Sequence, residues 1–437
     1  MPVRANLIRL TLLGAVTGLT AGVTVLGFRW LIESSQLLFL PDGRLGNYEG
    51  LPDWAIVALP VFGGLALGLV FERLPPSLQS VGIVHVIQQL RHTGRPNLPL
   101  GNAVVQFLAG AFAIVCGHSV DREGPGVHIG AATGTQVGVK SEDADTFTLT
   151  AGGAAAAIAA AFNTPLAGVI FVIEVLGVRY RVDRFIPIMT ASIVGAVISR
   201  AAYGATPSFS LARELSMASL YELFFLVVLG VVTGLIAVAF ITLTEQANRM
   251  TQAWRPTPAF MLAGLVTGLI GLVYPQILGI SYDTLNDILN DHLTQNVLAG
   301  LVVGKLIATA VSIGLRLPGG LIGPSLVMGG ALGGVLGVAV QQVSMPTGSE
   351  SFYATIGMVA MMSAVLRAPL AALFALLEMT GEPNIILPGM TVVVSADLIA
   401  RQILGRDSVF EHLRLLGTPP LAEATSKTMD KEQDHAS

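Results

Sequence analysis

The stretch TFTLTAGGAAAAIAAAFNTPLAGVIFVI, residues 146–173, contains no Asp, Glu, Lys or Arg in 28 positions. A helix needs about 20 predominantly apolar residues to cross a bilayer, so this stretch is long enough to span one. The same absence of charge recurs along the chain, at 10–28, 54–71, 96–120, 223–244, 256–282 and 317–349. Seven such stretches predict an all-α polytopic membrane protein.

The overall composition agrees with this class and excludes others. Of the 437 residues, 53% are hydrophobic and 12% are charged, about half the charged fraction of soluble domains. The formal net charge is −4 without a basic stripe, which argues against a nucleic-acid partner. The single cysteine, Cys116, rules out an intrachain disulfide framework, and no Walker, HExxH or GxSxG motif is present. We therefore expect no enzyme and no metal site.

Several apolar stretches are interrupted by Gly, Pro or charge and are too short for simple crossings. Helices are predicted at 6–38, 54–73, 81–91, 100–117, 124–139, 147–162, 164–178, 186–203, 219–247, 258–273, 298–313, 323–341, 352–364, 367–380 and 384–403. Helix ends at membrane depth are tolerated only where protein or a polar cavity surrounds them. The broken helices therefore indicate a transport pathway.

The two halves of the chain carry a weak internal repeat. GPGVHIGAATG at 124–134 recurs 199 residues later as GPSLVMGGALG at 323–333. PLAGVIFVIE at 165–174 recurs 204 residues later as PLAALFALLE at 369–378. Repeated halves with broken helices are typical of transporters, whose site lies where the halves meet.

These features predict one transmembrane domain with a short tail. The domain covers residues 1–417, with repeat halves at about 6–205 and 218–416, and a polar tail follows at 418–437. Arginine clusters at 4–9 and 179–184 indicate cytoplasmic faces, and we expect both termini to be cytoplasmic.

The motif Asp121-Arg122-Glu123-Gly124-Pro125 is the strongest functional candidate. Gly-Pro suits a helix start and places Glu123 at the positive end of the helix. If Glu123 swings away or takes a proton, the same backbone N–H groups can receive a free anion. Alternatively, Glu123 only caps the helix and pairs with Arg122. The second Gly-Pro, at 323–324, offers a helix start without a carboxylate, which favours an anion site.

Residues 122–125 resemble the G[K/R]EGP motif of the CLC chloride channel and transporter family, and residues 320–324 resemble its GxFxP motif. Residues 165–174, 368–380 and 406–410 are also similar to that family. The resemblance spans about residues 7–416. It implies the CLC architecture, with tilted and broken helices in two repeated halves. It further implies a voltage-gated chloride channel or a chloride–proton antiporter that forms a homodimer in the lipid bilayer of the cell membrane, inner or plasma. Bound chloride ions would be its only cofactor.

The resemblance also assigns roles to residues. Glu123 would be the gating glutamate, whose side chain competes with external chloride. The implied anion-binding residues are Ser80, Val81, Gly82, Ile83, Arg122, Gly124, Leu321, Ile322 and Phe410. Ungapped alignment puts Val81 at the family's serine position and Ser80 one residue earlier, so either can face the anion. Phe410 replaces a tyrosine whose hydroxyl touches the anion, which removes one donor.

Two further departures from the family pattern affect the expected mechanism. Asp121 stands where the family has a glycine; it either pairs with Arg122 or adds negative potential at the anion entry, and pairing is the favoured interpretation. Val175 stands at the position of the inner glutamate of the exchangers, and valine cannot relay a proton. This favours transport of chloride that is channel-like or weakly proton-coupled.

Other functions remain as alternatives. One is an antiporter with a non-standard proton path, through Glu174 or His85. Glu174 is more simply structural, because Glu378 repeats it in the second half. A fluoride or organic-anion secondary transporter is less favoured, since an organic anion would require a Lys or Arg at the site.

Overall fold

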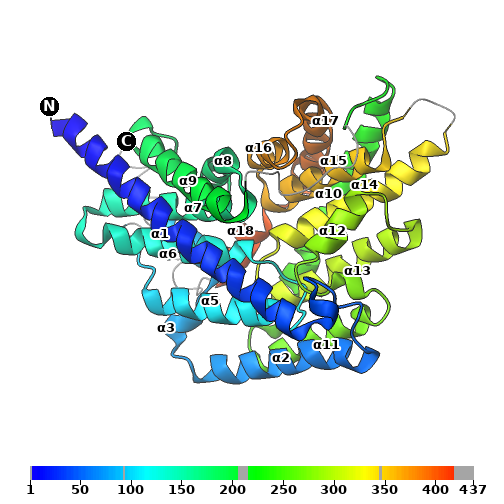
Figure 1. Cartoon of the computed structure of the whole chain (residues 1–437), viewed down its shortest axis with the longest axis horizontal. Coiled ribbons are helices and arrows are strands. Elements are labelled where there is room, and N and C mark those ends of the chain that lie inside the picture. Colours follow the sequence, from blue (N-terminus) through cyan, green and yellow to red (C-terminus); the bar gives the residue numbers. More distant parts are fainter. Residues whose placement is uncertain (1, 92–93, 205–214, 344–346, 418–437) are drawn as a thin grey trace, which may run out of the picture.

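The computed structural model describes residues 2–91, 94–204, 215–343 and 347–417 (Figure 1). Within these ranges the α-helices are α1 (Pro2–Phe39), α2 (Asp53–Arg73), α3 (Pro76–Gln79), α4 (Gly82–Arg91), α5 (Leu100–Val115), α6 (Glu123–Val137), α7 (Asp143–Phe162), α8 (Pro165–Glu174), α9 (Val182–Tyr203), α10 (Glu222–Thr251), α11 (Pro256–Gly271), α12 (Tyr282–Leu289), α13 (Gln295–Gly314), α14 (Ile322–Gln341), α15 (Glu350–Leu366), α16 (Pro369–Thr380), α17 (Ile386–Asp397) and α18 (Val409–Gly417). Short 3-10 turns are η1 (Pro41–Gly43), η2 (Gly138–Lys140), η3 (Pro275–Ile277) and η4 (Pro383–Ile385), and η5 (Leu398–Ile403) is a π-helix.

The all-α polytopic fold predicted from the sequence is confirmed. Eight helical segments of the described chain are long and apolar enough to cross a membrane: residues 6–39 of α1, then α2, α7, α9, α10, α13, α14 and the segment Pro383–Ile403. No β-strand occurs in the described ranges. The predicted tail at 418–437 and the predicted end of the first half at 205 lie outside the described residues.

Glycines allow the helices of each half to touch backbone to backbone. A methyl group added to Gly153 of α7 would collide with the carbonyl oxygen of Gly130 on α6. In the second half, a methyl group on Gly357 of α15 would collide in the same way with Gly329 on α14. Close approach through small residues is the usual basis of helix association in a bilayer. These contacts fix the two helices that begin at the candidate site, α6 and α14.

The short helices α8 and α16 lie side by side near the top of Figure 1 and hold each other's first turns. Glu174, the last residue of α8, accepts hydrogen bonds from two N–H groups at the start of α16, at 2.8 and 3.1 Å. Glu378 of α16 accepts two from the start of α8, at 2.9 and 3.0 Å. A carboxylate at a helix start satisfies orphan N–H groups and complements the helix dipole.

Candidate anion-binding site

The helices α6 and α14 begin next to each other at an isolated antiparallel bridge. The backbone N–H of Asp121 donates to the Gly320 carbonyl at 3.1 Å, and that of Gly320 donates to the Asp121 carbonyl at 3.2 Å. Asp121 precedes α6 by two residues, and Gly320 precedes α14 by two residues. The unpaired N–H groups of both helix starts therefore converge in one place, where they favour a negative charge.

The carboxylate of Asp121 fills this place. Its Oδ1 accepts hydrogen bonds from the backbone N–H groups of Glu123 and Gly124, both at 3.0 Å. Its Oδ2 accepts one from the N–H of Gly323 at 2.7 Å. Among the ion pairs of the described residues, none joins Asp121 to Arg122, so the predicted pairing is wrong. The side chain instead turns toward backbone donors that belong to both halves of the chain.

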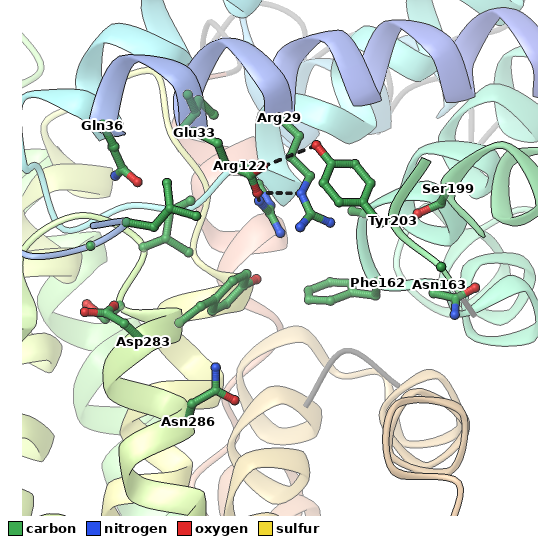
Figure 2. A pocket seen from close by; sticks show the side chains of 18 residues that line it. Arg29, Glu33, Gln36, Arg122, Phe162, Asn163, Ser199, Tyr203, Asp283 and Asn286 are labelled. Carbon is green, nitrogen blue, oxygen red and sulfur yellow. Dashed lines mark hydrogen bonds and ion pairs between the residues drawn. The ribbon is translucent and has the colours of Figure 1, made fainter. Parts of the chain in front are cut away.

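Arg122 lies in a chain of alternating charges with α1. Its Nε is 3.3 Å from Oε1 of Glu123, and its Nη1 is 3.3 Å from Oε1 of Glu33. Glu33 also pairs with Arg29, at 2.5 Å. Figure 2 shows Arg29, Glu33 and Arg122 gathered beside Tyr203, whose hydroxyl donates to Glu33 at 3.2 Å. In this conformation Glu123 is buried and pairs with Arg122, as the alternative to a gating role supposes. It does not cap the helix, because the N–H groups at the helix starts donate to Asp121.

Within the described part of the chain, two cavities reach this region, and no residue lines both. The first has a volume of about 400 Å³ and lies at the C-terminal ends of α1 and α9, with Arg29, Arg122 and Tyr282 in its wall (Figure 2). The second has a volume of about 340 Å³ and lies between α4, α18 and the end of α10. Arg122 borders the first cavity, and Gly124 and Gly320 border the second.

The second cavity brings together most of the predicted anion-binding residues. Its wall includes Ser80, Val81, Gly82, Ile83, Gly124, Leu321 and Phe410. Two predicted residues lie elsewhere: Arg122 borders the first cavity, and Ile322 borders a small apolar gap with Phe162 and Met362. Both Ser80 and Val81 face the second cavity, so the structure keeps both as candidates.

The helix α18 is fixed so that Phe410 faces the second cavity. Arg91 of α4 donates to Oε2 of Glu411 at 2.7 Å, and Arg414 donates to its Oε1 at 2.6 Å. The hydrogen bond from Arg414, with the charge of Arg91, lowers the pKa of Glu411 below its ordinary value. These pairs are therefore intact at neutral pH and are lost as the pH falls through the lowered pKa.

The residues considered for proton movement make different contacts. Val175 is buried at the end of α8, and Glu174 beside it binds the start of α16. His85 borders the second cavity, and its Nδ1 lies 3.0 Å from Nε2 of the buried His128 on α6. Glu174 is thus engaged as a structural group, whereas the histidine pair joins a cavity to the helix that carries the site.

Sequence reasoning did not assign Lys305 and Tyr282 to this region. Lys305 of α13 is fully buried and donates to the carbonyls of Ile277 and Gly279, both at 2.9 Å, and to the hydroxyl of Ser281 at 2.7 Å. It thereby fixes the backbone that leads into α12, whose first residue, Tyr282, faces Arg122 at 5.3 Å from the ring centre. A lysine inside an apolar segment is a signal of such a role.

Broken helices whose starts converge between two cavities are typical of a membrane transport protein. The model of the family described as voltage gated chloride channel matches residues 63–401. The chain therefore belongs to this family, the CLC family, and the resemblance seen in its motifs is confirmed.

Relatives with established names include both channels and exchangers. The chain is 27% identical over 417 residues to the voltage-gated ClC-type chloride channel ClcB of Escherichia coli O81 (strain ED1a), covering 92% of this chain and 98% of the relative. It is also 27% identical to the H(+)/Cl(-) exchange transporter ClcA of Salmonella arizonae, covering 90% and 86%. Among solved structures, a slow cyanobacterial Cl-/H+ antiporter has a TM-score of 0.79 at 21% identity, covering 94% and 98%. A CLC-type fluoride/proton antiporter has a TM-score of 0.76 at 19% identity, covering 93% and 98%.

Proposed function

We propose that this CLC protein transports chloride across the membrane through a pathway gated by Glu123, in a channel-like or weakly proton-coupled manner. The observation that carries the proposal is the convergence of the α6 and α14 starts between two cavities. Backbone N–H groups supply positive potential there without a cation that would trap the anion. The site suits a small anion that must bind and also leave.

In the proposed passage of an anion, each charged group near the site has a role. Arg29 and Arg122, at the first cavity, attract the anion, and Glu33 keeps their net charge low. Glu123 pairs with Arg122 at this entrance, so its carboxylate competes with an arriving anion. Protonation of Glu123 removes that competition. The anion then passes the helix starts into the second cavity, which Phe410 and Leu321 border.

The degree of proton coupling depends on which groups near this route could carry a proton. Val175 offers no group that could carry a proton, which supports channel-like transport. The paired histidines His85 and His128 support the second candidate, an antiporter with a different proton path, because they lead from the second cavity to α6. The named relatives include one channel and one exchanger, so they favour neither.

The test uses purified protein in liposomes loaded with chloride, with chloride efflux and external pH recorded together and without a protonophore. We expect efflux that charge compensation by a potassium ionophore accelerates, with no stoichiometric proton uptake. Stoichiometric proton entry would replace the channel-like candidate by the antiporter. Absence of chloride efflux, with efflux of fluoride or of carboxylates in parallel liposomes, would overturn the choice of chloride.

Glu123→Gln tests the gate. The neutral side chain keeps its size and cannot release or take a proton, so we expect flux to persist and its pH dependence to disappear. The matched control is Glu142→Gln, since Glu142 is exposed before α7. Loss of all transport, or an unchanged pH profile of the flux, would contradict a gating role.

A further inference from the structure

We propose that Asp121 is a tethered anion that occupies the binding position between the starts of α6 and α14, so that a transported anion must displace its carboxylate. This inference rests on the proposed function and adds a second carboxylate to the pathway. Glu123 controls entry from the first cavity, and Asp121 holds the helix-start N–H groups themselves.

The contacts of Asp121 are those of a bound anion. Its side chain is fully buried, and its two oxygens take three backbone N–H groups at 2.7 to 3.0 Å. Two of these donors belong to α6 and one, Gly323, belongs to α14. Three N–H groups directed at one carboxylate form a stronger set than neutral hydrogen bonds, because the acceptor is charged.

In the described structure no cationic side chain makes an ion pair or a hydrogen bond with this carboxylate, although Lys305 is near enough to interact with it electrostatically. Arg122 is engaged by Glu33 and Glu123, and Lys305 is directed at two carbonyls and the Ser281 hydroxyl. The direct contacts of the Asp121 carboxylate are therefore with peptide N–H groups, as expected for a free anion at a helix start.

At the backbone bridge between the two halves, there is space for only one side chain. Asp121 faces Gly320, 199 residues later in the chain, and a methyl group added to Gly320 would collide with Oδ1 of Asp121. The carboxylate thus fills space that the glycine leaves open. Arg122 on one side borders the first cavity, and Gly124 and Gly320 on the other border the second. Asp121 itself borders neither cavity, and the proposed route between them passes this place.

Asp121→Gly tests the inference by exchanging the tethered anion for a free one. The variant and the wild-type protein are compared in detergent by melting temperature, in sodium chloride and in sodium gluconate at equal ionic strength. We expect the variant to melt lower in gluconate and to recover by at least about 3 °C in about 300 mM chloride, because a ligand that binds only the folded state stabilises it. Wild-type protein should respond by less than about 1 °C.

Two companion variants separate this effect from a structural one. Asp53→Gly removes an exposed acid that begins α2 and lines neither cavity, and its melting temperature should not depend on chloride. Asp121→Asn keeps the size of the side chain without its charge, and chloride should raise its melting temperature too. A chloride-independent loss of stability in Asp121→Gly, or its failure to fold even in high chloride, would overturn the inference, as would an Asn variant without a chloride response.

Transport measurements distinguish failure of the inference from failure of the function. In liposomes at low chloride, Asp121→Gly should transport chloride at least about three-fold faster than wild type, since nothing tethered competes for the N–H groups. Equal or slower flux in a folded variant would overturn the role of Asp121 while wild-type flux keeps the proposed function intact. If wild-type protein moves no chloride, the proposed function fails, and the chloride response of the melting temperature still reports whether the site takes a free anion.

Discussion

Phe410 lacks the hydroxyl group that a tyrosine would have at the second cavity. Its ring is buried and borders the cavity, and the ion pair of Glu411 with Arg91 of α4 holds the helix in place. The family usually has a tyrosine at this position, so Phe410→Tyr would return a hydroxyl donor to the anion. A hydrogen bond of this kind contributes about 1 kcal/mol, which is about five-fold in the dissociation constant.

We therefore expect Phe410→Tyr to bind chloride up to about five-fold more tightly, measured by isothermal titration of the purified protein. Phe39→Tyr is the control, because Phe39 is 70% exposed at the end of α1. Unchanged affinity in Phe410→Tyr would mean that the ring does not face the bound anion.

Among individual residues, the sequence could predict some members of the candidate site but not the contacts that they make. Gly124 and Phe410 could be predicted as site residues because motifs and their spacing are visible in the sequence, and both border the second cavity. The contacts of Asp121 could not be predicted, because one of its three donors, Gly323, lies 202 residues away. Arg122 is adjacent in sequence, but its side chain turns toward Glu33 on α1, another contact that spacing does not reveal.

At the element scale, the most specific contact is the reciprocal hydrogen bonding between α8 and α16, in which a glutamate of each helix accepts from the start of the other. Glu174→Gln and Glu378→Gln each keep the shape of the side chain and lose its charge. Charge-assisted hydrogen bonds are roughly twice as strong as neutral ones, so each variant should lower the free energy of unfolding by about 1 kcal/mol. The two losses should be similar, because the donor distances are similar, at 2.8 to 3.1 Å.

Denaturant unfolding of the purified protein measures these losses. The proton record of each variant in liposomes provides the control, since a structural glutamate leaves it unchanged. Abolished proton movement in Glu174→Gln, with unchanged stability, would instead place Glu174 on a proton path.

Elements were predictable where their signal is long and apolar. Every predicted helix is present, since charge-free stretches and Gly-Pro starts mark them clearly. The helix α12 was missed because its eight residues, YDTLNDIL, carry two acids and lie between longer apolar stretches. Only the packing of its apolar face, with Leu285 and Ile288 buried, makes this segment a helix in the fold.

At the scale of the whole molecule, we infer that the two halves are structural repeats. Residues 163 and 367, which follow α7 and α15, are separated by the 204-residue offset of the sequence repeat. Both adopt left-handed backbone, with φ of 60° at Asn163 and 58° at Arg367. The backbone bridge joins Asp121 to Gly320 at the other offset, 199 residues. The candidate site would then lie where equivalent positions of the two halves meet.

The short lengths of α8 and α16 give a reason to expect a homodimer. The helices α8 and α16 have 10 and 12 residues, about 15 and 18 Å of helix against a hydrocarbon core of about 30 Å. If both lie within the membrane, ends that carry Glu174 and Glu378 fall inside the core, where lipid does not tolerate them. Leu166 and Leu370, beside these ends, are 37% and 53% exposed in one chain. A second copy on this face would cover them.

We expect purified protein to have twice the mass of the 45.5 kDa chain by light scattering corrected for detergent. In a Cys116→Ser background, Leu370→Cys should form a disulfide-linked dimer on oxidation, because a two-fold interface brings the same patch of both copies together. Leu12→Cys is the control, since Leu12 on α1 is 64% exposed on another helix. A monomeric mass, or cross-linking at Leu12 equal to that at Leu370, would contradict a dimer through α16, because lipid alone would then cover this face.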